Sequence, residues 1–518
     1  MRPMNSPLTQ SPAWQNLVQH AKDMGSVSLA DIVLGDPARL ENCTIALEGL
    51  QLNFALQHVT PKTIDLLTAL AEQQNLTNWR ERMFAGEKIN TSENHAALHT
   101  ALRQKSDQPV MVDGRDVIPD IKTIRKKMEM VTAVLRDGRR RGATGKPIRH
   151  IVNIGIGGSD LGPRLAVRAL APYATGPHVH FVANLDAFDI VSTLENLDPA
   201  ETLFVVVSKT FATQETLRNA TTARQWVTEK LGAQAVAHHF VAVSANPAKV
   251  VDFGIPLESI FPIWDWVGGR FSLWSAVGLT AMLTLGVSHF DKMCDGAAAM
   301  DAHFHTAPLQ KNMPVLMALF GIWNRNFRNM SAQAVLPYGE RLRDLPRYFQ
   351  QLEMESNGKT VTRDGQAIDY ATAPIIFGEC GTVGQHSFHQ WLHQGSEIVP
   401  VDFIGVRQDD LGHPEHHRSL LANMLAQASA LAFGRTGDYP GGRPSNLIML
   451  DHLEPYHFGM LLALYEHKTF AQGVIWGVNS FDQPGVELGK KMAHALELQT
   501  TPQDRQGAFL SDLWKKSL

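Results

Sequence analysis

The segment that decides the fold is Thr202-Leu-Phe-Val-Val-Val-Ser-Lys-Thr-Phe-Ala-Thr-Gln-Glu-Thr216. Its apolar run, residues 203–207, is typical of a strand that is buried on both faces of a parallel sheet. A helix should begin just after it, where unpaired backbone N–H groups and the positive end of the helix dipole favour an anion. One N-cap would account for only one hydroxyl. The segment therefore predicts a phosphate site formed by Ser208, Lys209, Thr210 and Thr213.

Short β-rich runs alternate with helix-length segments on both sides of this stretch. The first series lies at residues 148–156, 178–183, 203–207 and 239–243, and the second at 332–336, 375–377, 398–404 and 446–450. This alternation predicts βαβ units on parallel sheets, so two similar α/β lobes are expected. The N-terminal region is predicted to be helical, for example at residues 61–73 and 92–103.

Length and composition limit the class of protein. A chain of 518 residues exceeds the span of one hydrophobic core, so more than one domain is expected. A net charge of −4 argues against a nucleic-acid surface and favours a small ligand. The longest apolar run, residues 273–287, is too short to span a bilayer and is predicted to be a buried helix.

Cysteine usage and the first residues bear on location. Three widely spaced cysteines fit a reducing compartment, and residues 1–12 lack the apolar core of a signal peptide. We therefore expect a cytoplasmic protein with neither a nucleic-acid nor a membrane partner.

A glycine-rich segment, Gly155-Ile-Gly-Gly-Ser-Asp-Leu-Gly162, follows the first predicted strand. Its glycines would let a phosphate or sugar approach the backbone closely, and Ser159 would supply a hydroxyl. The dinucleotide fingerprint fails, because Asp160 stands where the third small residue is needed. Asp186 after the second strand imitates the ribose-binding acid, so nicotinamide binding stays open as a minor alternative.

The segment Tyr348-Phe-Gln-Gln-Leu-Glu-Met-Glu-Ser-Asn-Gly-Lys359 supplies a candidate base. Gln351 and Glu355 are four residues apart, which places them on one face of a helix that Gly358 would end. Glu353 points elsewhere. The competing interpretation, that both glutamates only solvate a surface face, is equally supported by the local sequence.

The segment from Gly381 to Gly395 contains three histidines at helical spacing: His386, His389 and His393. Such a stripe could ligate a metal, but the H-E-x-x-H pattern of hydrolytic zinc sites is absent. His386 lies behind glycines at a predicted helix start and is better placed for proton transfer. His389 and His393 are predicted to pack or to form hydrogen bonds.

Two further segments contribute polar candidates. Gly268-Gly-Arg-Phe-Ser-Leu-Trp-Ser275 leads Arg270 into the apolar run, where an arginine needs either a structural carboxylate or a developing oxyanion as its partner. The second segment, residues 479–490, brings Gln483 and Lys490 in near the C-terminus. Taken alone, this second segment indicates little.

Taken together and in this order, the six motifs closely resemble the phosphoglucose isomerase family, from about Phe84 to Lys490. No single segment would be sufficient. The segments that carry the resemblance are 208–213, 268–275, 354–359, 384–386 and 485–490. The chain departs from the usual family pattern at Val383, His389 and Pro484, where Asn, an aromatic residue and Trp are common.

The resemblance implies an α/β fold with two doubly wound parallel-sheet lobes of the sugar-isomerase (SIS) type, a helical N-terminal region and a C-terminal helical arm. Residues 1–112 would be the helical part of the large domain, 113–286 the small lobe, and 287–518 the large lobe with the arm. The implied activity is the reversible conversion of glucose 6-phosphate to fructose 6-phosphate in glycolysis and gluconeogenesis, through a cis-enediol. The family needs neither a metal nor an organic cofactor.

The resemblance also implies a role for each candidate residue. Glu355 would shuttle the proton between C2 and C1, Arg270 would face the enediolate oxygen, and Gln351 would orient the base. His386 and Lys490 would assist ring opening, with the histidine contributed across the interface of a homodimer. The phosphate group would be held by Ser208, Lys209, Thr210 and Thr213, with Ser159 and Gln483 nearby.

Two other classes of protein compete with the isomerase. A non-catalytic sugar-phosphate-binding regulator would keep the phosphate site but would not need Glu355, Arg270, His386 and Lys490 together. A metal-dependent hydrolase that uses the histidine stripe would lose its activity in a chelator, whereas an isomerase would not.

Overall fold

The computed structural model describes residues 7–435, 437–498, 500 and 505–517. The chain divides into a large unit, Met1–Ser480, and a C-terminal unit, Phe481–Leu518. The domain boundaries expected after residues 112 and 286 stay predictions. No helix within the described residues has both the length and the apolar character that a membrane crossing requires.

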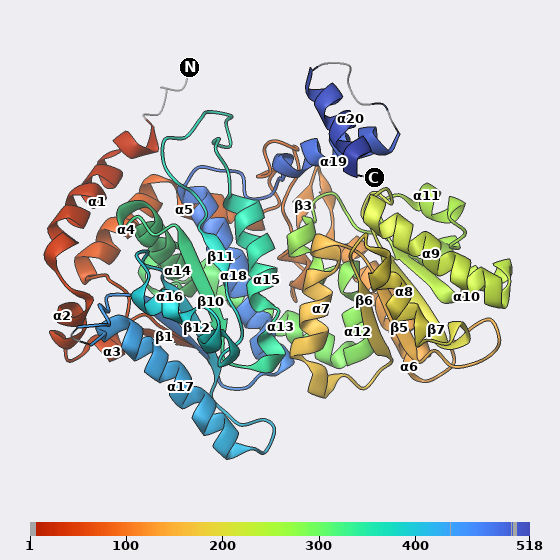
Figure 1. Ribbon diagram of the computed structural model, residues 1–518, viewed down its shortest axis with the longest axis horizontal. Helices are drawn as coiled ribbons and strands as arrows, with labels where there is room; N and C mark the ends of the chain where they lie inside the picture. The colour runs from red at the N-terminus through yellow and green to blue at the C-terminus, as the bar shows by residue number, and fades with distance from the viewer. Residues whose placement is uncertain (1–6, 436, 499, 501–504, 518) are drawn as a thin grey trace. The chain divides into compact units, whose positions relative to one another are not determined.

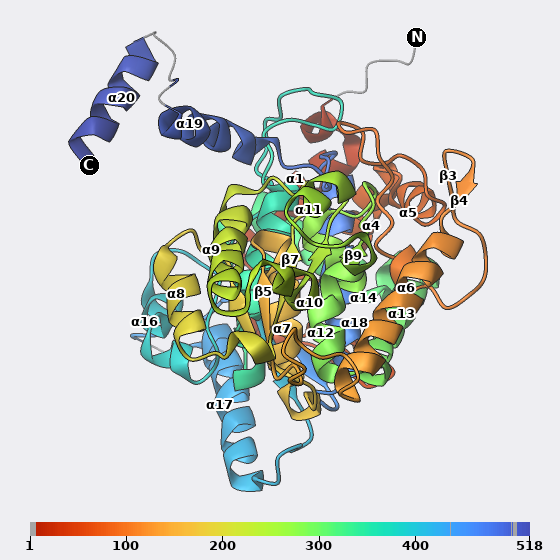
Figure 2. The same cartoon turned by 90° about the vertical axis from the view of Figure 1, so that its right-hand side faces the viewer.

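The first sheet of the large unit is entirely parallel. Its order is β6-β5-β7-β8-β9, so the direction of winding reverses between β5 and β7. Figure 1 shows helices on both sides of these strands, and the turned view in Figure 2 agrees, with α8 and α9 on one side and α6 and α12 on the other. The strands are β5 (His150–Ile154), β6 (His178–Val182), β7 (Thr202–Val207), β8 (Phe240–Val243) and β9 (Ile260–Phe261).

The second sheet has a parallel part with the same winding. Its order is β1-β2-β13-β12-β10-β11, in which β10, β11, β12 and β13 are parallel and the N-terminal hairpin β1–β2 is antiparallel. The strands are β1 (Thr44–Leu47), β2 (Leu50–Asn53), β10 (Ala332–Pro337), β11 (Ile375–Phe377), β12 (Val401–Val406) and β13 (Ser445–Leu450). The predicted α/β class with two parallel sheets is confirmed.

Helices cover both sheets, and their apolar faces form two cores. The first core lies between the first sheet and helices that include α8 and α9, and the second contains strand residues together with apolar residues of α17. The helices around the first sheet are α6 (Ile118–Arg136), α7 (Leu161–Ala169), α8 (Ala187–Glu195), α9 (Gln214–Leu231), α10 (Val236–His239), α11 (Pro247–Asp252) and α12 (Leu279–Leu285).

The other helices belong mainly to the second sheet and the N-terminal region. They are α1 (Pro12–Asp23), α2 (Leu29–Leu34), α3 (Arg39–Asn42), α4 (Pro61–Gln73), α5 (Leu76–Phe84), α13 (Val287–Thr306), α14 (Met313–Ile322), α15 (Leu345–Phe349), α16 (His389–Gln394), α17 (Pro414–Phe433) and α18 (Pro455–Ile475). Helix α18 is buried along its whole length except at Tyr456, which is partly exposed. The C-terminal unit contains α19 (Glu487–Glu497) and α20 (Arg505–Ser517), so its predicted helical character is confirmed.

Local signals explain some of these boundaries and two prediction errors. The helix predicted at residues 61–73 is confirmed as α4, and it begins with a capping box between Thr60 and Thr63. The helix predicted at residues 92–103 is wrong, because only a 3₁₀ turn, Ala101–Arg103, forms there. The apolar run 273–287 is buried, but it consists of 3₁₀ turns and only a short helix, α12. A small hairpin, β3 (Met111–Val112) and β4 (Arg115–Asp116), precedes α6.

Candidate functional site

The segment after β7 forms the first part of the site, and residues 208–213 are referred to as the hydroxyl turn. It follows β7 at the point where the winding of the first sheet reverses, and ligands of doubly wound sheets bind at such a point. Ser208 is buried and donates a hydrogen bond of 3.1 Å to the hydroxyl of Thr213, the N-cap of α9. The Thr213 side chain makes no capping hydrogen bond, and Thr210 is exposed. Capping therefore does not explain these hydroxyls.

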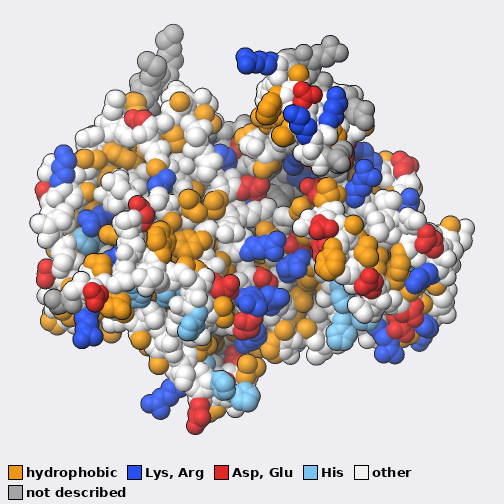
Figure 3. Space-filling model, viewed as in Figure 1, with side chains coloured by type: hydrophobic (Ala, Val, Ile, Leu, Met, Phe, Trp, Pro, Cys, Tyr) orange, Lys and Arg blue, Asp and Glu red, His pale blue; other side chains and the backbone are white. Residues whose placement is uncertain are grey.

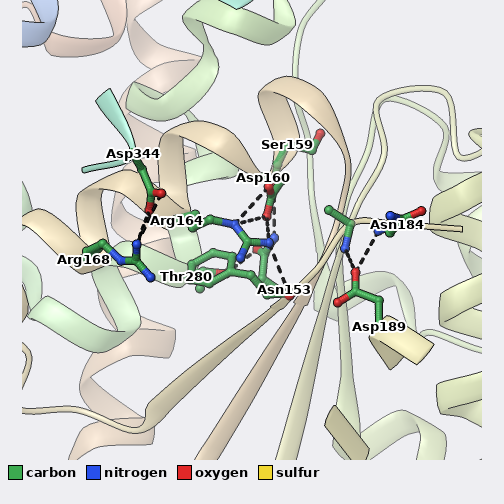
Figure 4. Close-up of polar contacts among 11 residues, drawn as sticks. Asn153, Ser159, Asp160, Arg164, Arg168, Asn184, Asp189, Thr280 and Asp344 are labelled. Atoms are coloured by element: carbon green, nitrogen blue, oxygen red, sulfur yellow. Dashed lines mark hydrogen bonds and ion pairs between the residues drawn. The ribbon is translucent and has the colours of Figure 1, made fainter. Parts of the chain in front are cut away.

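The loop after β5 lies at the other side of the same reversal. Asn153 on β5 donates a 3.2 Å hydrogen bond to the carbonyl of Ser159 and accepts one of 2.7 Å from Thr280 (Figure 4). The next residue, Asp160, is buried and bound by Arg164 on α7. Burial raises the pKa of Asp160, although the neighbouring guanidinium opposes this. The loop that carries Ser159 is therefore held from below by a buried polar network.

Lys209 connects the hydroxyl turn to the segment that precedes Arg270. Its Nζ donates to the carbonyls of Asp265 at 3.1 Å and Val267 at 3.4 Å. The Asp265 carboxylate is 3.5 Å from the same nitrogen. Val267 shortly precedes the 3₁₀ turn Gly269–Trp274, which contains Arg270. Lys209 therefore contacts the same segment of chain that carries Arg270.

The candidate base lies on a helix, residues 345–357, which is referred to as the Glu355 helix. It begins as α15 and continues as a π-helix over Gln350–Glu355, and π-turns are frequent at functional sites. Arg270 Nη1 is 3.4 Å from the Glu355 carboxylate, and Arg270 Nε donates a 2.6 Å hydrogen bond to Ser356. The Arg270 side chain is 2% exposed and that of Glu355 is 24% exposed, so the carboxylate stays accessible beside a buried guanidinium.

Glycines let these parts approach one another. A β-carbon on Gly158 would lie 2.1 Å from the carbonyl oxygen of Gly269, so no other residue fits there without displacing backbone. A β-carbon on Gly157, whose φ is +60°, would lie 3.0 Å from Gln351 Nε2. The loop after β5 therefore touches both the Arg270 turn and the Glu355 helix.

The two glutamates of the Glu355 helix have different surroundings. Glu353 is buried and forms a 2.7 Å ion pair with Lys468, which is also buried. Glu355 is partly exposed and faces Arg270. The interpretation that both glutamates only solvate a surface face is therefore wrong.

The three histidines of the 381–395 segment separate as predicted. His389 and His393 both form hydrogen bonds to the amide oxygen of Gln427, at 3.2 and 2.9 Å. His386 ends a 3₁₀ turn, Val383–His386, and is exposed. Among the residues that the structure describes, no group of three or more His, Cys, Asp or Glu is arranged to hold a metal ion.

The last two candidates, Gln483 and Lys490, lie in the C-terminal unit. Lys490 is on α19, where it is exposed and forms a 2.9 Å ion pair with Glu487 one turn earlier. Gln483 precedes a 3₁₀ turn, Pro484–Val486. Their participation in the site stays a prediction.

Three residues after Glu355 were not given a structural role by the sequence. Ser356 is fully buried against Arg270, and Asn357 donates to the carbonyl of Thr469 at 2.8 Å. Lys359 Nζ donates to the carbonyls of Glu355 and Ser356 at 3.2 and 2.9 Å, which satisfies the end of the helix. These residues fix the Glu355 helix at its C-terminal end. The sequence did contain them, within Met354-Glu-Ser-Asn-Gly-Lys359, but gave no sign of their partners.

The fold and this geometry define a class: a two-sheet α/β protein in which a cluster of hydroxyls and a lysine is joined to a carboxylate paired with a buried arginine. Such a site suits proton transfer on an anionic substrate. The family model of phosphoglucose isomerase matches residues 53–513. The chain belongs to this family.

Individual relatives are similar to this chain over nearly its whole length. Glucose-6-phosphate isomerase of Deinococcus deserti is 48% identical over 516 residues, with 95% of each chain covered. The enzyme of the same name from Methylococcus capsulatus is 46% identical over 514 residues, with 94% of each chain covered. The crystal structure of a glucose-6-phosphate isomerase from Chlamydia trachomatis is 33% identical, superimposes with a TM-score of 0.90, and covers 99% of this chain and 100% of that chain.

Proposed function

We propose that this protein interconverts glucose 6-phosphate and fructose 6-phosphate, using the residues assembled around Arg270 and Glu355. Near full-length relatives that carry the name glucose-6-phosphate isomerase support the activity. The single observation that carries the residue assignment is the contact of 3.4 Å between Arg270 and Glu355. Lys209 contacts the segment that leads to Arg270, through the carbonyl of Val267.

The phosphate group of the substrate binds at the hydroxyl turn in this proposal. The N-terminus of α9 supplies backbone N–H groups and a positive dipole end, and Lys209 supplies a full charge. The hydroxyls of Ser208, Thr210 and Thr213 add hydrogen-bond donors, and Ser159 approaches from the loop after β5. Gln483 is assigned to the phosphate by the family resemblance alone.

The isomerisation step needs a base and a fixed positive charge. Glu355 removes the proton from C2 of the open-chain sugar and returns it to C1, while the hydroxyl proton of O2 passes to O1, so the carbon skeleton is conserved and no external oxidant is required. Negative charge develops on the substrate oxygen during this transfer, and the Arg270 guanidinium stabilises it because Ser356 already holds it in place. Gln351, which lies beside Gly157, helps to orient this base.

Ring opening precedes proton transfer, and we assign it to His386 and Lys490. Both side chains are exposed in the single chain, which fits residues that reach their site only after assembly or movement. We therefore propose that the functional form is a homodimer in which His386 serves the site of the partner subunit. A cytoplasmic location completes the proposal, since all three cysteines are unpaired thiols.

A coupled assay tests the activity directly. Formation of glucose 6-phosphate from fructose 6-phosphate should proceed at the same rate with and without EDTA, because the proposed steps use only side chains. Loss of the activity in EDTA would contradict the metal-free steps proposed above, and absence of activity in both buffers would favour a sugar-phosphate-binding regulator or a metal-dependent hydrolase.

Mixing two inactive variants tests the assignment of His386. In a hybrid dimer of Glu355→Gln and His386→Gln chains, one site would receive both intact residues if His386 acts across the interface. Random mixing should then restore about a quarter of the unchanged activity. If His386 served its own chain, every site would lack one residue and no activity would return.

A further inference from the structure

A polar cavity lies at the amino ends of the strands of the first sheet, opposite to the carboxyl ends that carry the hydroxyl turn. It has a volume of about 550 Å³ and lies at the amino ends of β5 and β6. The hydroxyl turn follows the carboxyl end of β7, which is parallel to β5, so the two sites are separated by the length of the strands. The polar side chains that line the cavity are Arg136, Arg149, His150, Thr175 and His178.

The charge of this cavity has one sign. Its lining residues, all within the described chain, include two arginines and two histidines but no aspartate or glutamate. Arg136 is fixed, since it donates to the carbonyl of Thr284 at 2.8 Å and to the hydroxyl of Thr175 at 2.5 Å. The carboxylate of Glu201 lies 3.5 Å from Arg149 Nε, and that arginine is 66% exposed. An anion in the cavity would therefore meet one guanidinium held by protein hydrogen bonds and one that is largely exposed.

Histidines continue this surface along the two strands. His150 and His178 are direct partners in the β5–β6 register, and their rings stack with centroids 5.9 Å apart. His150 Nδ1 is also 3.2 Å from His180 Nε2. Figure 3 shows histidine side chains gathered on the part of the molecule that contains the first sheet. Three imidazoles and two guanidiniums thus occupy one small area.

These histidines are not arranged for a metal. Within the part of the chain that the structure describes, no group of three or more such side chains has the geometry to hold a metal ion. Burial lowers the pKa of both His150 and His180, and neighbouring imidazoles lower it further. The imidazoles of His150 and His180 therefore stay neutral to a lower pH than a free histidine would, and a bound anion would favour their protonation.

We propose that this cavity binds a compact dianion, either a phosphate group or a dicarboxylate, and binds it more tightly as the pH falls. Two arginines supply a constant positive charge, and the imidazoles add charge only when protonated. The charged and titratable groups that face the cluster are Arg136, Arg149, His150, His178, His180 and, beside Arg149, Glu201.

Calorimetric titration with sulfate tests the proposal, because sulfate stays a dianion throughout the range used. The protein is first saturated with the equilibrium mixture of the two hexose phosphates, which occupies the hydroxyl turn. Sulfate should still bind at one site, and several-fold more tightly at about pH 6 than at about pH 8. Arms with orthophosphate and with citrate distinguish a phosphate ligand from a polycarboxylate.

A double variant, Arg149→Gln with His178→Gln, locates the site. It should weaken sulfate binding by about tenfold or more, while kcat/KM for fructose 6-phosphate stays unchanged. The matched control is Arg141→Gln with His238→Gln, which makes the same charge change at exposed positions of the same lobe outside the cavity. The proposal is wrong if none of the three anions binds to the saturated protein, or if both double variants bind equally well.

Discussion

The two sheets have the same winding but differ at the point where that winding reverses. In the first sheet the reversal lies between β5 and β7, and in the second it lies between β10 and β12. Topology alone would make both points equally good ligand sites. Their side chains differ. The winding therefore provides a position where a ligand can bind, and the side chains at that position determine whether one binds.

The first reversal point combines a group of hydroxyls with Lys209 and with the ion pair of Asp160 and Arg164, whereas the residues described at the second form ion pairs with one another. Beside β12 and β13, Asp410 binds His452 at 2.7 Å, and Asp451 binds Arg407 at 2.6 Å. Arg341, after β10, lies 3.5 Å from Asp410. The second lobe contributes its proposed base instead from the Glu355 helix, which lies between β10 and β11 in the chain.

The largest expected effect comes from Glu355. Glu355→Gln keeps the size of the side chain and removes the base, so kcat should fall by about 10²–10⁴-fold. The melting temperature should change little, since this carboxylate is partly exposed. Steady-state kinetics with thermal unfolding checks both, and a variant with near-full turnover would remove the base from the account.

Glu353 should give the opposite result. Glu353→Gln leaves Lys468 buried without its ion-pair partner, which should cost about 3–5 kcal/mol of unfolding free energy. Denaturant unfolding measures this loss. The account predicts that any Glu353→Gln protein that folds still turns over substrate, so a stable but inactive variant would contradict the separation of roles.

Lys209 and Arg407 compare the two reversal points directly. Lys209→Ala removes the full charge of the hydroxyl turn, so kcat/KM should fall by about tenfold to a hundredfold. Arg407→Ala breaks a surface ion pair and should leave kcat/KM unchanged, at a cost of about 0–1 kcal/mol in stability. Equal effects of the two substitutions on kcat/KM would contradict the claim that only the first reversal point binds the substrate.

The smallest effect concerns pH. A hydrogen bond to Asp410 raises the pKa of His452. The pair therefore stabilises the folded state below the unfolded-state pKa, and this contribution is lost as the pH rises through the raised pKa. His452→Gln should lower the melting temperature slightly more at about pH 5.5 than at about pH 8.5. Proton NMR titration of His452 checks the direction of its pKa.

The strand pattern from residue 148 onward was predictable because the strands are short and mostly apolar, and β7 is an almost continuous apolar run. The hairpin β1–β2 was not expected, since its turn at Glu48 and Gly49, with φ of 43° and 87°, uses Glu where Asn or Asp gives the usual signal. Its strands are stabilised by pairing with β13, about 400 residues away in the chain, which no local pattern reports.

The sequence predicted the elements that carry several candidate residues but not the contacts between those residues. Local spacing placed Gln351 and Glu355 on one helix and the hydroxyls at the start of α9. The support of Arg270 by Ser356, 86 residues later, depends on tertiary packing. The proposed role of His386 rests on the family resemblance, since within the described residues the single chain gives this histidine no partner in the site by which to judge it.

One crystal structure tests the central claim most directly, that the phosphate group uses the first reversal point and not the second. The crystal would contain Glu355→Gln protein with bound fructose 6-phosphate. We predict that the phosphate oxygens lie within hydrogen-bond distance of Ser208, Thr210 and Thr213, with C1 and C2 beside residue 355. A phosphate group bound near Arg341 and Arg407 would contradict the account.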